Sequence, residues 1–451
     1  MDSAERGEAG AEEQRMLGWI EQRIGGKVVR CERQARWRPA FFLDVERAGE
    51  IVPLYFRGDR GATDHGVYPL EHEMKVLQVL ERNDIPVPHI YGFCDEPRGI
   101  LMQRCAGRHN LATATNEEER VAVLDHFIDL LARMHRIDLA EFEAIGLERP
   151  RTPEQLGLAD LAHWERAYRR LKRRPEPMIE FTLRWLRRNV PTQRSRAALL
   201  QADCGQFLFE RSRVTALLDF ELAYIGDPMA DFAGLRNRTL SEPLGDLQRA
   251  LRRYEQQMGE PVDLRAIDYH TVRFGLATPM SVAHVVADPP PGTALVQYQA
   301  WYAVYGRLCV EVMAHMVGLE LAELELPAPA PTRHTPAHRA LLGLLDAGKD
   351  EDPFRAFQIA NTRRIAHWTA RADLYGPALE QQDLDEAGAI LGRRPATWSE
   401  ADTALEKLAL TAGPESDAVF ITYFQRRFLR HEALLAGALE ELEGAKIEML
   451  D

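Results

Sequence analysis

The stretch LLQADCGQFLFERSRVTALLDFELAYIGDPMADFAGL, residues 199–235, decides the fold. An apolar run ends at Asp203, a tight loop with Gly205 and Gln206 follows, and a pair of strand-like runs then leads to a second acid, Asp219. This pattern predicts two carboxylates at one end of a hairpin. One acid in such a pair can orient or deprotonate a hydroxyl while the other holds Mg²⁺ on nucleotide phosphates. The stretch therefore favours phosphoryl-transfer chemistry.

Upstream of this stretch, the chain alternates short strand-like runs with turn residues. The runs VVRCER, AFFLDVE, IVPLYFR and GILMQR are bounded by Gly, Pro and Asp, which is typical of strands. One segment between them, residues 68–83, has apolar residues every three or four positions and predicts an amphipathic helix. Residues 16–103 are therefore expected to form a small α+β lobe.

The remainder of the chain is predicted to be mostly helical. Asn116 and Glu119 form a capping-box pattern ahead of a long helix, and residues 104–324 are expected to form a helical lobe that carries the acidic hairpin. Residues 325–337 contain four prolines and indicate a linker. Residues 338–451 are charged and helical in pattern, which predicts a separate helical domain, and the small, acidic residues 1–15 suggest a disordered start.

Composition limits the classes of protein that the chain can belong to. Its 451 residues are 45% apolar and 28% charged, as expected of a soluble protein with two or three domains. No run reaches the roughly 18 to 20 apolar residues of a membrane span, and the N-terminus lacks a signal-peptide pattern. The five scattered cysteines contain no CxxC pair, so a reducing cytoplasm is the expected location. A net charge of −13 argues against binding nucleic acid through phosphate neutralisation.

The acidic stretch resembles the aminoglycoside phosphotransferase and choline kinase group, especially its hydroxyacyl-CoA kinase branch. Members carry His-Gly-Asp, a loop ending in Asn, a hairpin, Leu-Asp-Trp or Phe-Glu, and Gly-Asp-Pro with a further Asp. The corresponding positions here are Gln201, Ala202 and Asp203, then Leu218 to Glu221, and then Gly226, Asp227 and Pro228 with Asp231. The resemblance implies a two-lobed protein kinase-like fold that uses ATP and Mg²⁺. It also implies that Asp203 is the catalytic base, that Asp219 is a metal ligand, and that Gln201, Asp227 and Asp231 hold loops.

The resemblance extends, more loosely, over about residues 17–320. It implies that Arg57 contacts nucleotide phosphates, that Glu73 pairs with Arg57, and that backbone groups near Gln103 and Arg104 read the adenine edge. By themselves, the side chains of Arg57 and Glu73 are equally compatible with ordinary surface positions. His135 matches the pattern as well, and its apolar flanks favour a buried structural histidine.

The loop after Asp203 departs from the family pattern. Gln206 stands three residues after Asp203, where the family has Asn five residues after its Asp. Two fewer residues remove up to roughly 7 Å of extended chain. Three outcomes remain open: Gln206 serves a shifted metal geometry, the site holds one metal where relatives hold two, or the site no longer transfers phosphate.

Two classes of function compete. The first is an ATP-dependent kinase of a small-molecule hydroxyl, with a hydroxyacyl-CoA as the leading acceptor and an aminoglycoside or macrolide as the alternative. The second is a pseudokinase, a nucleotide-binding or partner-binding module. The shortened loop favours the second class, whereas retention of both Asp203 and Asp219 favours the first. The sequence leaves the oligomeric state open, and it predicts no nucleic-acid or membrane partner.

Overall fold

The computed structural model describes residues 3–34, 38–61, 67–348 and 353–450, and it divides the chain into two compact units. The first unit comprises Met1–Pro150, Arg196–Asp231 and Glu242–Val262. The second comprises Arg151–Ser195, Phe232–Ser241 and Asp263–Asp451.

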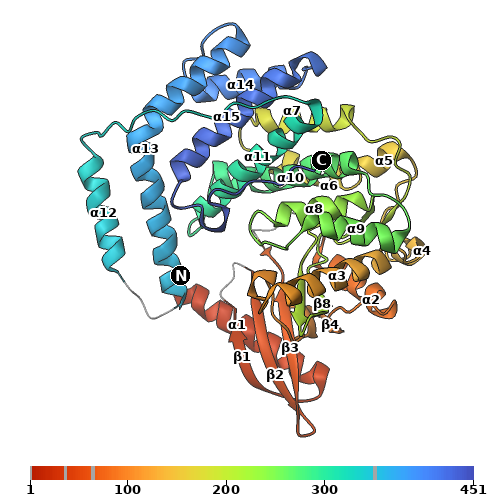
Figure 1. Ribbon diagram of the computed structural model, residues 1–451. Helices are drawn as coiled ribbons and strands as arrows, with labels where there is room; N and C mark the ends of the chain where they lie inside the picture. Colours follow the sequence, from red (N-terminus) through yellow and green to blue (C-terminus); the bar gives the residue numbers. More distant parts are fainter. Residues whose placement is uncertain (1–2, 35–37, 62–66, 349–352, 451) are drawn as a thin grey trace. The chain divides into compact units, whose positions relative to one another are not determined.

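A five-stranded antiparallel sheet opens the first unit. The strand order is β1 (Lys27–Arg33), β2 (Ala40–Arg47), β3 (Glu50–Gly58), β5 (Arg98–Gln103) and β4 (Ile90–Asp95) (Figure 1). On β2, the alternate residues Phe41, Leu43 and Val45 are buried, because successive side chains of a strand point to opposite faces of the sheet. The other face of β2 carries Phe42, which lies opposite Tyr55 of β3.

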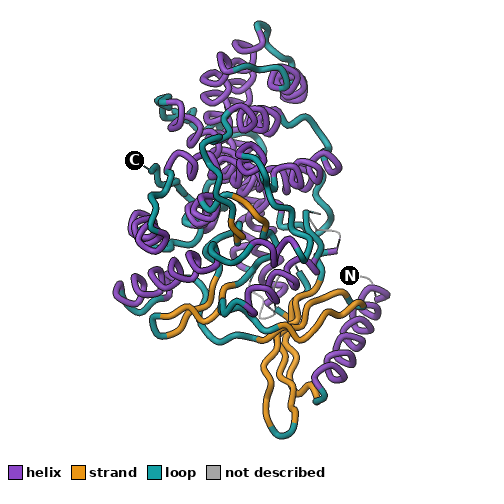
Figure 2. Tube along the Cα trace, turned by 90° about the vertical axis from the view of Figure 1, so that its right-hand side faces the viewer, coloured by secondary structure: helices purple, strands orange, loops and turns teal. Residues whose placement is uncertain are grey.

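Helix α1, Ser3–Ile24, covers most of the stretch for which the composition suggested disorder. Met16, Ile20 and Ile24 recur every four residues, so they share one face of the helix. They are buried in one cluster with Leu43 and Leu54 of the sheet. Figure 2 shows α1 running beside the strands. The four-residue spacing of these apolar residues indicates a helix, which the small and acidic composition of residues 1–15 does not suggest.

The rest of the first unit surrounds the acidic hairpin. The hairpin consists of β7 (Phe207–Glu210) and β8 (Arg213–Leu217), and β6 (Ala198–Leu200) pairs with β9 (Tyr224–Gly226). Besides α1, this unit contains the helices α2 (Leu70–Arg82), α3 (Glu117–Met134), α4 (Leu139–Glu143) and α9 (Leu247–Met258). The predicted cap of α3 is present, since the Asn116 side chain accepts a hydrogen bond from the Glu119 amide at 2.8 Å. Helix α8 (Met229–Arg238) begins in this unit and continues into the second.

Among its described residues, the second unit consists of helices joined by loops and contains no strand. It contains α5 (Pro153–Gly157), α6 (Leu161–Leu171), α7 (Pro177–Arg188), α10 (Leu264–Ala287), α11 (Leu295–Val317), α12 (Thr335–Ala347), α13 (Pro353–Leu391), α14 (Trp398–Ala409) and α15 (Asp417–Leu435). The ring of Phe181 on α7 packs against Phe420 and Phe424 on α15, with centroids 5.0 and 6.0 Å apart. The predicted boundaries at 325–337 and 338–451 therefore do not coincide with those of the compact units.

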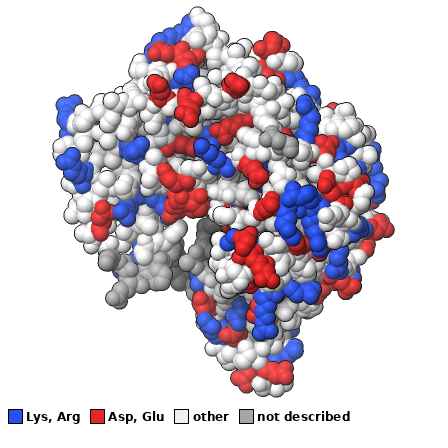
Figure 3. All heavy atoms as spheres, viewed as in Figure 1, with Lys and Arg blue, Asp and Glu red and all other residues white. Residues whose placement is uncertain are grey.

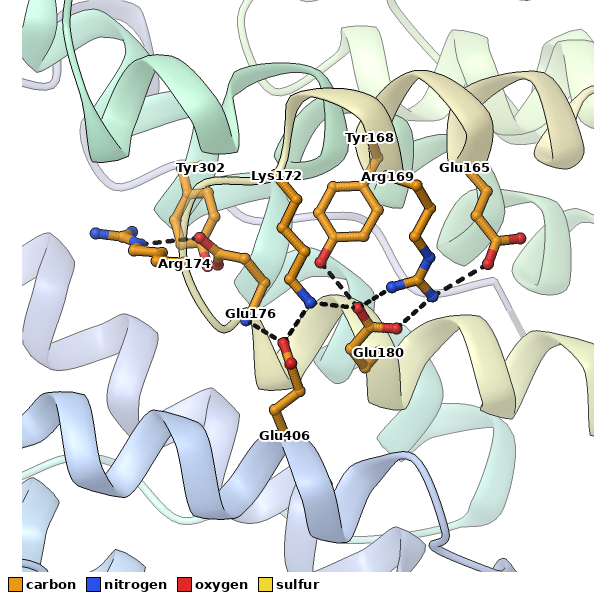
Figure 4. A network of polar contacts seen from close by, with 9 residues as sticks. All are labelled: Glu165, Tyr168, Arg169, Lys172, Arg174, Glu176, Glu180, Tyr302 and Glu406. Carbon is orange, nitrogen blue, oxygen red and sulfur yellow. Dashed lines mark hydrogen bonds and ion pairs between the residues drawn. The ribbon is translucent and has the colours of Figure 1, made fainter.

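A buried polar network joins α14 to the segment between α6 and α7 (Figure 4). The Glu180 carboxylate accepts hydrogen bonds from the Tyr168 hydroxyl at 3.0 Å and from Lys172 at 2.8 Å. Lys172 also contacts Glu406 of α14 at 2.5 Å, and Glu406 accepts the backbone N–H of Glu176 at 2.6 Å. These contacts link α14 to α6 and α7, and they give the buried Glu180 carboxylate the partners that a buried charge needs.

The α+β fold class predicted from the sequence is confirmed: a small β-rich part is followed by mostly helical parts. On the face that Figure 3 shows, acidic and basic side chains are interspersed. Among the described residues, no helix has the length and apolar character needed to cross a bilayer.

Candidate active site

The two acids that the sequence singled out lie at the same end of the hairpin. β6 leads into Asp203, and β8 leads into Asp219. Gln206 lies between them, because its amide donates to Asp203 Oδ2 at 2.8 Å and its side chain also hydrogen-bonds to Asp219. Gly205, with φ of +99°, gives the tight turn that the shorter loop requires. The shortened loop thus brings Gln206 to both carboxylates.

The buried side chain of Gln201 holds this loop through three hydrogen bonds. Its Nε2 donates to the carbonyl oxygens of Gln206 at 3.0 Å and Leu218 at 2.7 Å, and its Oε1 accepts the Gly205 amide at 3.1 Å. The side chain is fully buried. Since Leu218 directly precedes Asp219, one glutamine sets the spacing between the two acidic segments.

The Asp231 carboxylate supports the same loop. It accepts the backbone N–H groups of Gln201 at 3.1 Å and Ala202 at 2.8 Å, together with His135 Nε2 at 3.0 Å. Ala202 has φ of +69°, a left-handed conformation that costs a non-glycine residue roughly 1–2 kcal/mol. Its hydrogen bond to Asp231 helps to hold that conformation. His135 is buried, and its Nδ1 lies 2.7 Å from the Tyr254 hydroxyl, which is the structural position expected from the sequence.

Asp227 holds the start of helix α8. Its side chain is buried and accepts the backbone N–H of Met229 at 3.1 Å. An acid at this position satisfies one of the amides that have no partner within the first turn of a helix. The Asp227 side chain thus links its loop to the first turn of α8.

We expect Gln201→Leu to destabilise the protein by about 3 kcal/mol, because two carbonyls and one amide in the buried loop lose their partner. Urea unfolding of the full chain measures the change. The exposed Gln256→Leu, on α9 of the same unit, serves as the control and is expected to stay within about 0.5 kcal/mol of the parent. Equal stability of the Gln201→Leu variant and the parent would contradict this role.

Arg57 joins the sheet to the acidic hairpin. It lies near the end of β3, opposite Ala40 of β2 and Ile100 of β5. Its Nε is 2.8 Å from Glu73 Oε2 on α2, and its Nη2 is 2.5 Å from Asp219 Oδ1. The structure therefore brings Arg57, Glu73 and Asp219 together. This is the arrangement that a kinase uses to place a cation between a helix carboxylate and nucleotide phosphates.

The charges of this cluster shift the acid–base behaviour of its carboxylates. Burial raises the pKa of Asp219, but Arg57, Arg38 and Arg60 outweigh this effect and hold it below its usual range. Burial raises the pKa of Glu73, and Arg57 offsets only part of that increase. Asp219 is therefore the carboxylate that stays anionic and suits a cation.

Three residues of the cluster had no role assigned to them from the sequence. Arg38 Nη2 lies 2.5 Å from Glu221 Oε2, Arg57 Nη2 lies 2.9 Å from the same oxygen, and Arg60 Nη2 contacts Glu221 Oε1. Glu221 belongs to the Leu-Asp-Phe-Glu run, so its closeness in sequence to Asp219 could have indicated that it belongs to this cluster. Apart from their charge, nothing in the sequence around Arg38 and Arg60 indicates that they belong to this cluster.

A cavity of about 820 Å³ opens beside these groups, entirely within the first unit. Phe42, Tyr55 and Met102 of the sheet and Leu208 and Leu218 of the hairpin line its apolar part. Its polar end includes Arg57, Glu73, Gln206 and Asp219.

Gln103 and Arg104 line the cavity as well. Their backbone N–H groups already donate to the carbonyls of His89 at 2.8 Å and Pro53 at 3.1 Å. The Arg104 side chain is 2.6 Å from Asp44. Their carbonyl oxygens, not these N–H groups, are thus the atoms through which this segment can contact a ligand.

The donor set at the polar end fits Mg²⁺. Mg²⁺ prefers oxygen ligands and binds through one or two carboxylates together with phosphates and water. Asp219 supplies an anionic oxygen. The Gln206 amide faces the acids through its Nε2, which donates to Asp203, so its oxygen would serve a metal only after the amide group rotates. Within the described ranges no three His, Cys, Asp or Glu side chains gather to hold a metal by themselves, so phosphates and water would complete the coordination.

The small β-rich part and the mostly helical parts form a kinase-like fold. The chain belongs to the phosphotransferase enzyme family, whose model matches residues 45–270, half of the chain. That match spans Arg57, Glu73, Asp203, Gln206 and Asp219.

Similar curated proteins are much longer than this chain. Acyl-CoA dehydrogenase family member 10 of Mus musculus is 27% identical over 180 residues, which are 37% of this chain and 16% of that protein. Acyl-CoA dehydrogenase family member 11 of Rattus norvegicus is 25% identical over 215 residues, 45% of this chain and 27% of that protein. The chain therefore spans less than a third of the length of either relative.

Two solved structures align over about two thirds of the chain. One is a thermostable mutant of aminoglycoside phosphotransferase APH(4)-Ia in a ternary complex with AMP-PNP and hygromycin B. It has 15% identity, covers 67% of this chain and 99% of its own, and gives a TM-score of 0.48. The other is macrolide 2'-phosphotransferase MphH from Brachybacterium faecium, with 19% identity, 65% and 97% coverage and a TM-score of 0.45.

Proposed function

We propose that the protein transfers the terminal phosphoryl group of ATP to a hydroxyl group of a small molecule. The observation that carries the proposal is the meeting of Arg57, Glu73, Asp219 and Gln206 at one end of a cavity, with Asp203 hydrogen-bonded to Gln206. Phosphoryl transfer depends mainly on positioning and on neutralising charge, and this end of the cavity offers groups for both tasks.

The residues take distinct roles in this reaction. The nucleobase lies against Phe42 and Tyr55, and its amino group donates to a backbone carbonyl at Gln103. Arg57 contacts the phosphates, while Glu73 orients its guanidinium. Asp219 and Gln206 would hold Mg²⁺, which supplies charge neutralisation on the phosphates when bound.

Asp203 acts on the acceptor. Its carboxylate accepts the hydroxyl proton as the hydroxyl oxygen forms a bond to the γ-phosphorus. The bond between that phosphorus and the β–γ bridging oxygen breaks, and ADP leaves. Gln206 holds Asp203 in place through the 2.8 Å hydrogen bond, and Gln201 and Asp231 hold the loop.

A CoA thioester that bears a hydroxyl is the acceptor we favour. Both curated relatives are named as acyl-CoA dehydrogenase family members, so the matching segment occurs in proteins named for acyl-CoA chemistry. The proposal includes a cytoplasmic location, which the five free thiols favour. An aminoglycoside or macrolide is the alternative acceptor.

The test is a phosphoryl-transfer assay of the full chain with Mg-ATP over a panel of hydroxyacyl-CoAs, sugars, aminoglycosides and macrolides. We expect ADP formation that depends on the acceptor and is strongest for a hydroxyacyl-CoA. Nucleotide binding without transfer to any acceptor would favour a nucleotide-binding pseudokinase instead.

A further inference from the structure

A second cavity lies wholly within the second unit, whereas the proposed transfer site lies in the first. Helices α11 and α15 lie side by side there (Figure 1), and they form two walls of a groove of about 770 Å³. The loop after α11 and the segment after α15 line the rest of the groove. Its volume suits a small-molecule ligand, since pockets for such ligands measure roughly 300–1,000 Å³. The proposed phosphoryl transfer does not involve this groove.

The walls of the groove are aliphatic. Leu321 and Leu324 of the loop, Leu429 of α15, and Ile447 and Met449 of the C-terminal segment all line it. Among the described residues, no phenylalanine, tyrosine or tryptophan does so. Aliphatic walls bury methylene groups well, whereas a flat aromatic ligand would find no ring to stack against. The groove therefore suits a ligand with a methylene chain.

Acidic side chains outnumber basic ones along the groove. In the described part of the chain, four glutamates line it against one arginine and one lysine: Glu311, Glu323, Glu432, Glu443, Arg307 and Lys446. Arg307 already lies 2.6 Å from Glu432 and 2.9 Å from Glu311, so one positive charge faces two carboxylates. Burial raises the pKa of Glu432, and Arg307 offsets only part of that rise. The groove therefore favours a cation.

Two oxygen atoms on α15 accept no hydrogen bond from any described residue. One is Oε1 of Gln425, a buried residue that is only 5% exposed. The other is Oε2 of Glu432, because Arg307 Nε donates to the Oε1 atom of that carboxylate. Buried polar groups are almost always hydrogen-bonded, and an acceptor left without a donor is costly. Both oxygens thus point to donors that a ligand supplies.

The spacing of these two acceptors defines the shape of the ligand. Gln425, Leu429 and Glu432 share one face of α15, because they are spaced four and three residues apart, and all three line the groove. Seven residues of helix place the two acceptors about 10 Å apart, with Leu429 between them. The complementary molecule has two donors joined by an aliphatic segment. The acidic lining favours donors that are positively charged.

We propose that the groove between α11 and α15 binds a linear aliphatic diamine, either free or as part of a longer polyamine. One ammonium group donates to Glu432, the other donates to Gln425, and the methylene chain lies along Leu429. Because Gln425 Oε1 is shielded from water, the amide rotates about its last side-chain bond to present this oxygen to the ligand. The site is independent of the proposed phosphoryl transfer, so either can fail without the other.

Calorimetry of the full chain with 1,8-diaminooctane, octylamine and octanoate tests the ligand class. We expect the diamine to bind at least about 10-fold more tightly than octylamine, because its second ammonium makes one more charged hydrogen bond. Octanoate should not bind, because it brings a negative charge to an acidic groove. Equal affinities of the diamine and octylamine, or tighter binding of octanoate, would overturn the proposal.

Gln425→Leu separates ligand binding from folding. The Gln425 side chain makes no hydrogen bond within the described residues, so its replacement costs the fold none, and the thermal unfolding temperature should not fall. Affinity for 1,8-diaminooctane should fall about 10-fold, whereas affinity for octylamine should change by less than about twofold, because octylamine uses Glu432. A role of Gln425 in folding alone would weaken both ligands equally.

A matched pair of variants on the loop after α11 tests the location. Ala322→Trp places a large side chain at an exposed position that lines the groove, and it should abolish diamine binding. Ala328→Trp, at an exposed position of the same loop outside the groove, should keep the affinity within about twofold of the parent. Thermal unfolding of both variants checks that they are folded. Diamine binding that is unchanged in Gln425→Leu and in Ala322→Trp would overturn the site.

Discussion

Asp203→Asn is expected to lower the turnover number for phosphoryl transfer by about 10³-fold, because a positioned general base contributes roughly 10²- to 10⁴-fold. Affinity for Mg-ATP should change by less than about twofold. The substitution keeps the shape of the side chain and an oxygen that can accept the Gln206 hydrogen bond. It removes the charge that accepts the proton of the acceptor hydroxyl. Steady-state kinetics with the preferred acceptor and calorimetry with Mg-ATP measure the two quantities.

Asp125→Asn provides the control for this substitution. Asp125 lies in the same unit and pairs with Arg249 at 2.6 Å on α9, outside the residues that line the cavity. Its turnover should equal that of the parent. If Asp203→Asn kept half of the parent's turnover, Asp203 would not be the base, and the roles of the two acids would have to be reassigned.

The second large effect is expected on truncation of the chain after residue 330. The sequence patterns predicted that residues 338–451 form a separate helical domain, which implies that the chain before residue 330 would be soluble and bind nucleotide without it. The structure leads us to expect the opposite, because α14 and α15 belong to the same compact unit as α7 and α11. Truncation removes Phe420 and Phe424 from Phe181, and Glu406 from Lys172 (Figure 4). Each buried aromatic contributes roughly 1.5–3 kcal/mol, and a whole domain has only about 5–15 kcal/mol.

Expression of residues 1–330 should therefore give insoluble or partly unfolded protein, as judged by solubility and by near-ultraviolet circular dichroism. Two point variants of the full chain sharpen the test. Phe424→Ala, at a buried position, should lower the free energy of unfolding by about 3–5 kcal/mol. Leu344→Gln, at a position that is 74% exposed on α12, should change it by less than about 0.5 kcal/mol. A soluble and folded 1–330 fragment would show instead that residues 338–451 form an independent domain.

Local sequence patterns were sufficient to predict the hairpin and its two acids. The alternation of strand-like runs with turn residues is a short-range property, and the family resemblance supplied roles for Asp203, Asp219 and Arg57. The structure places Arg57 2.8 Å from Glu73 and 2.5 Å from Asp219, and the roles of these residues stay predictions. The capping of α3 by Asn116 is local in the same sense.

Long-range contacts were the part that the sequence concealed. Arg38 and Glu221 are 183 residues apart in the chain, and nothing near either residue indicates the other. The same holds for Lys172 and Glu406, which are 234 residues apart. Burial of a charged residue depends on partners that only the folded chain supplies, so local patterns do not indicate these contacts.

The ATP affinity of the parent and of Asp219→Asn, measured with and without Mg²⁺, tests most directly whether Asp219 holds the metal that accompanies the nucleotide phosphates. With Mg²⁺, the variant should bind ATP at least about 10-fold more weakly, because an anionic metal ligand is lost. With a chelator present, it should bind at least as well as the parent, because Arg57, 2.5 Å from Asp219, is released to the phosphates. Equal affinity of parent and variant in the presence of Mg²⁺ would contradict the claim.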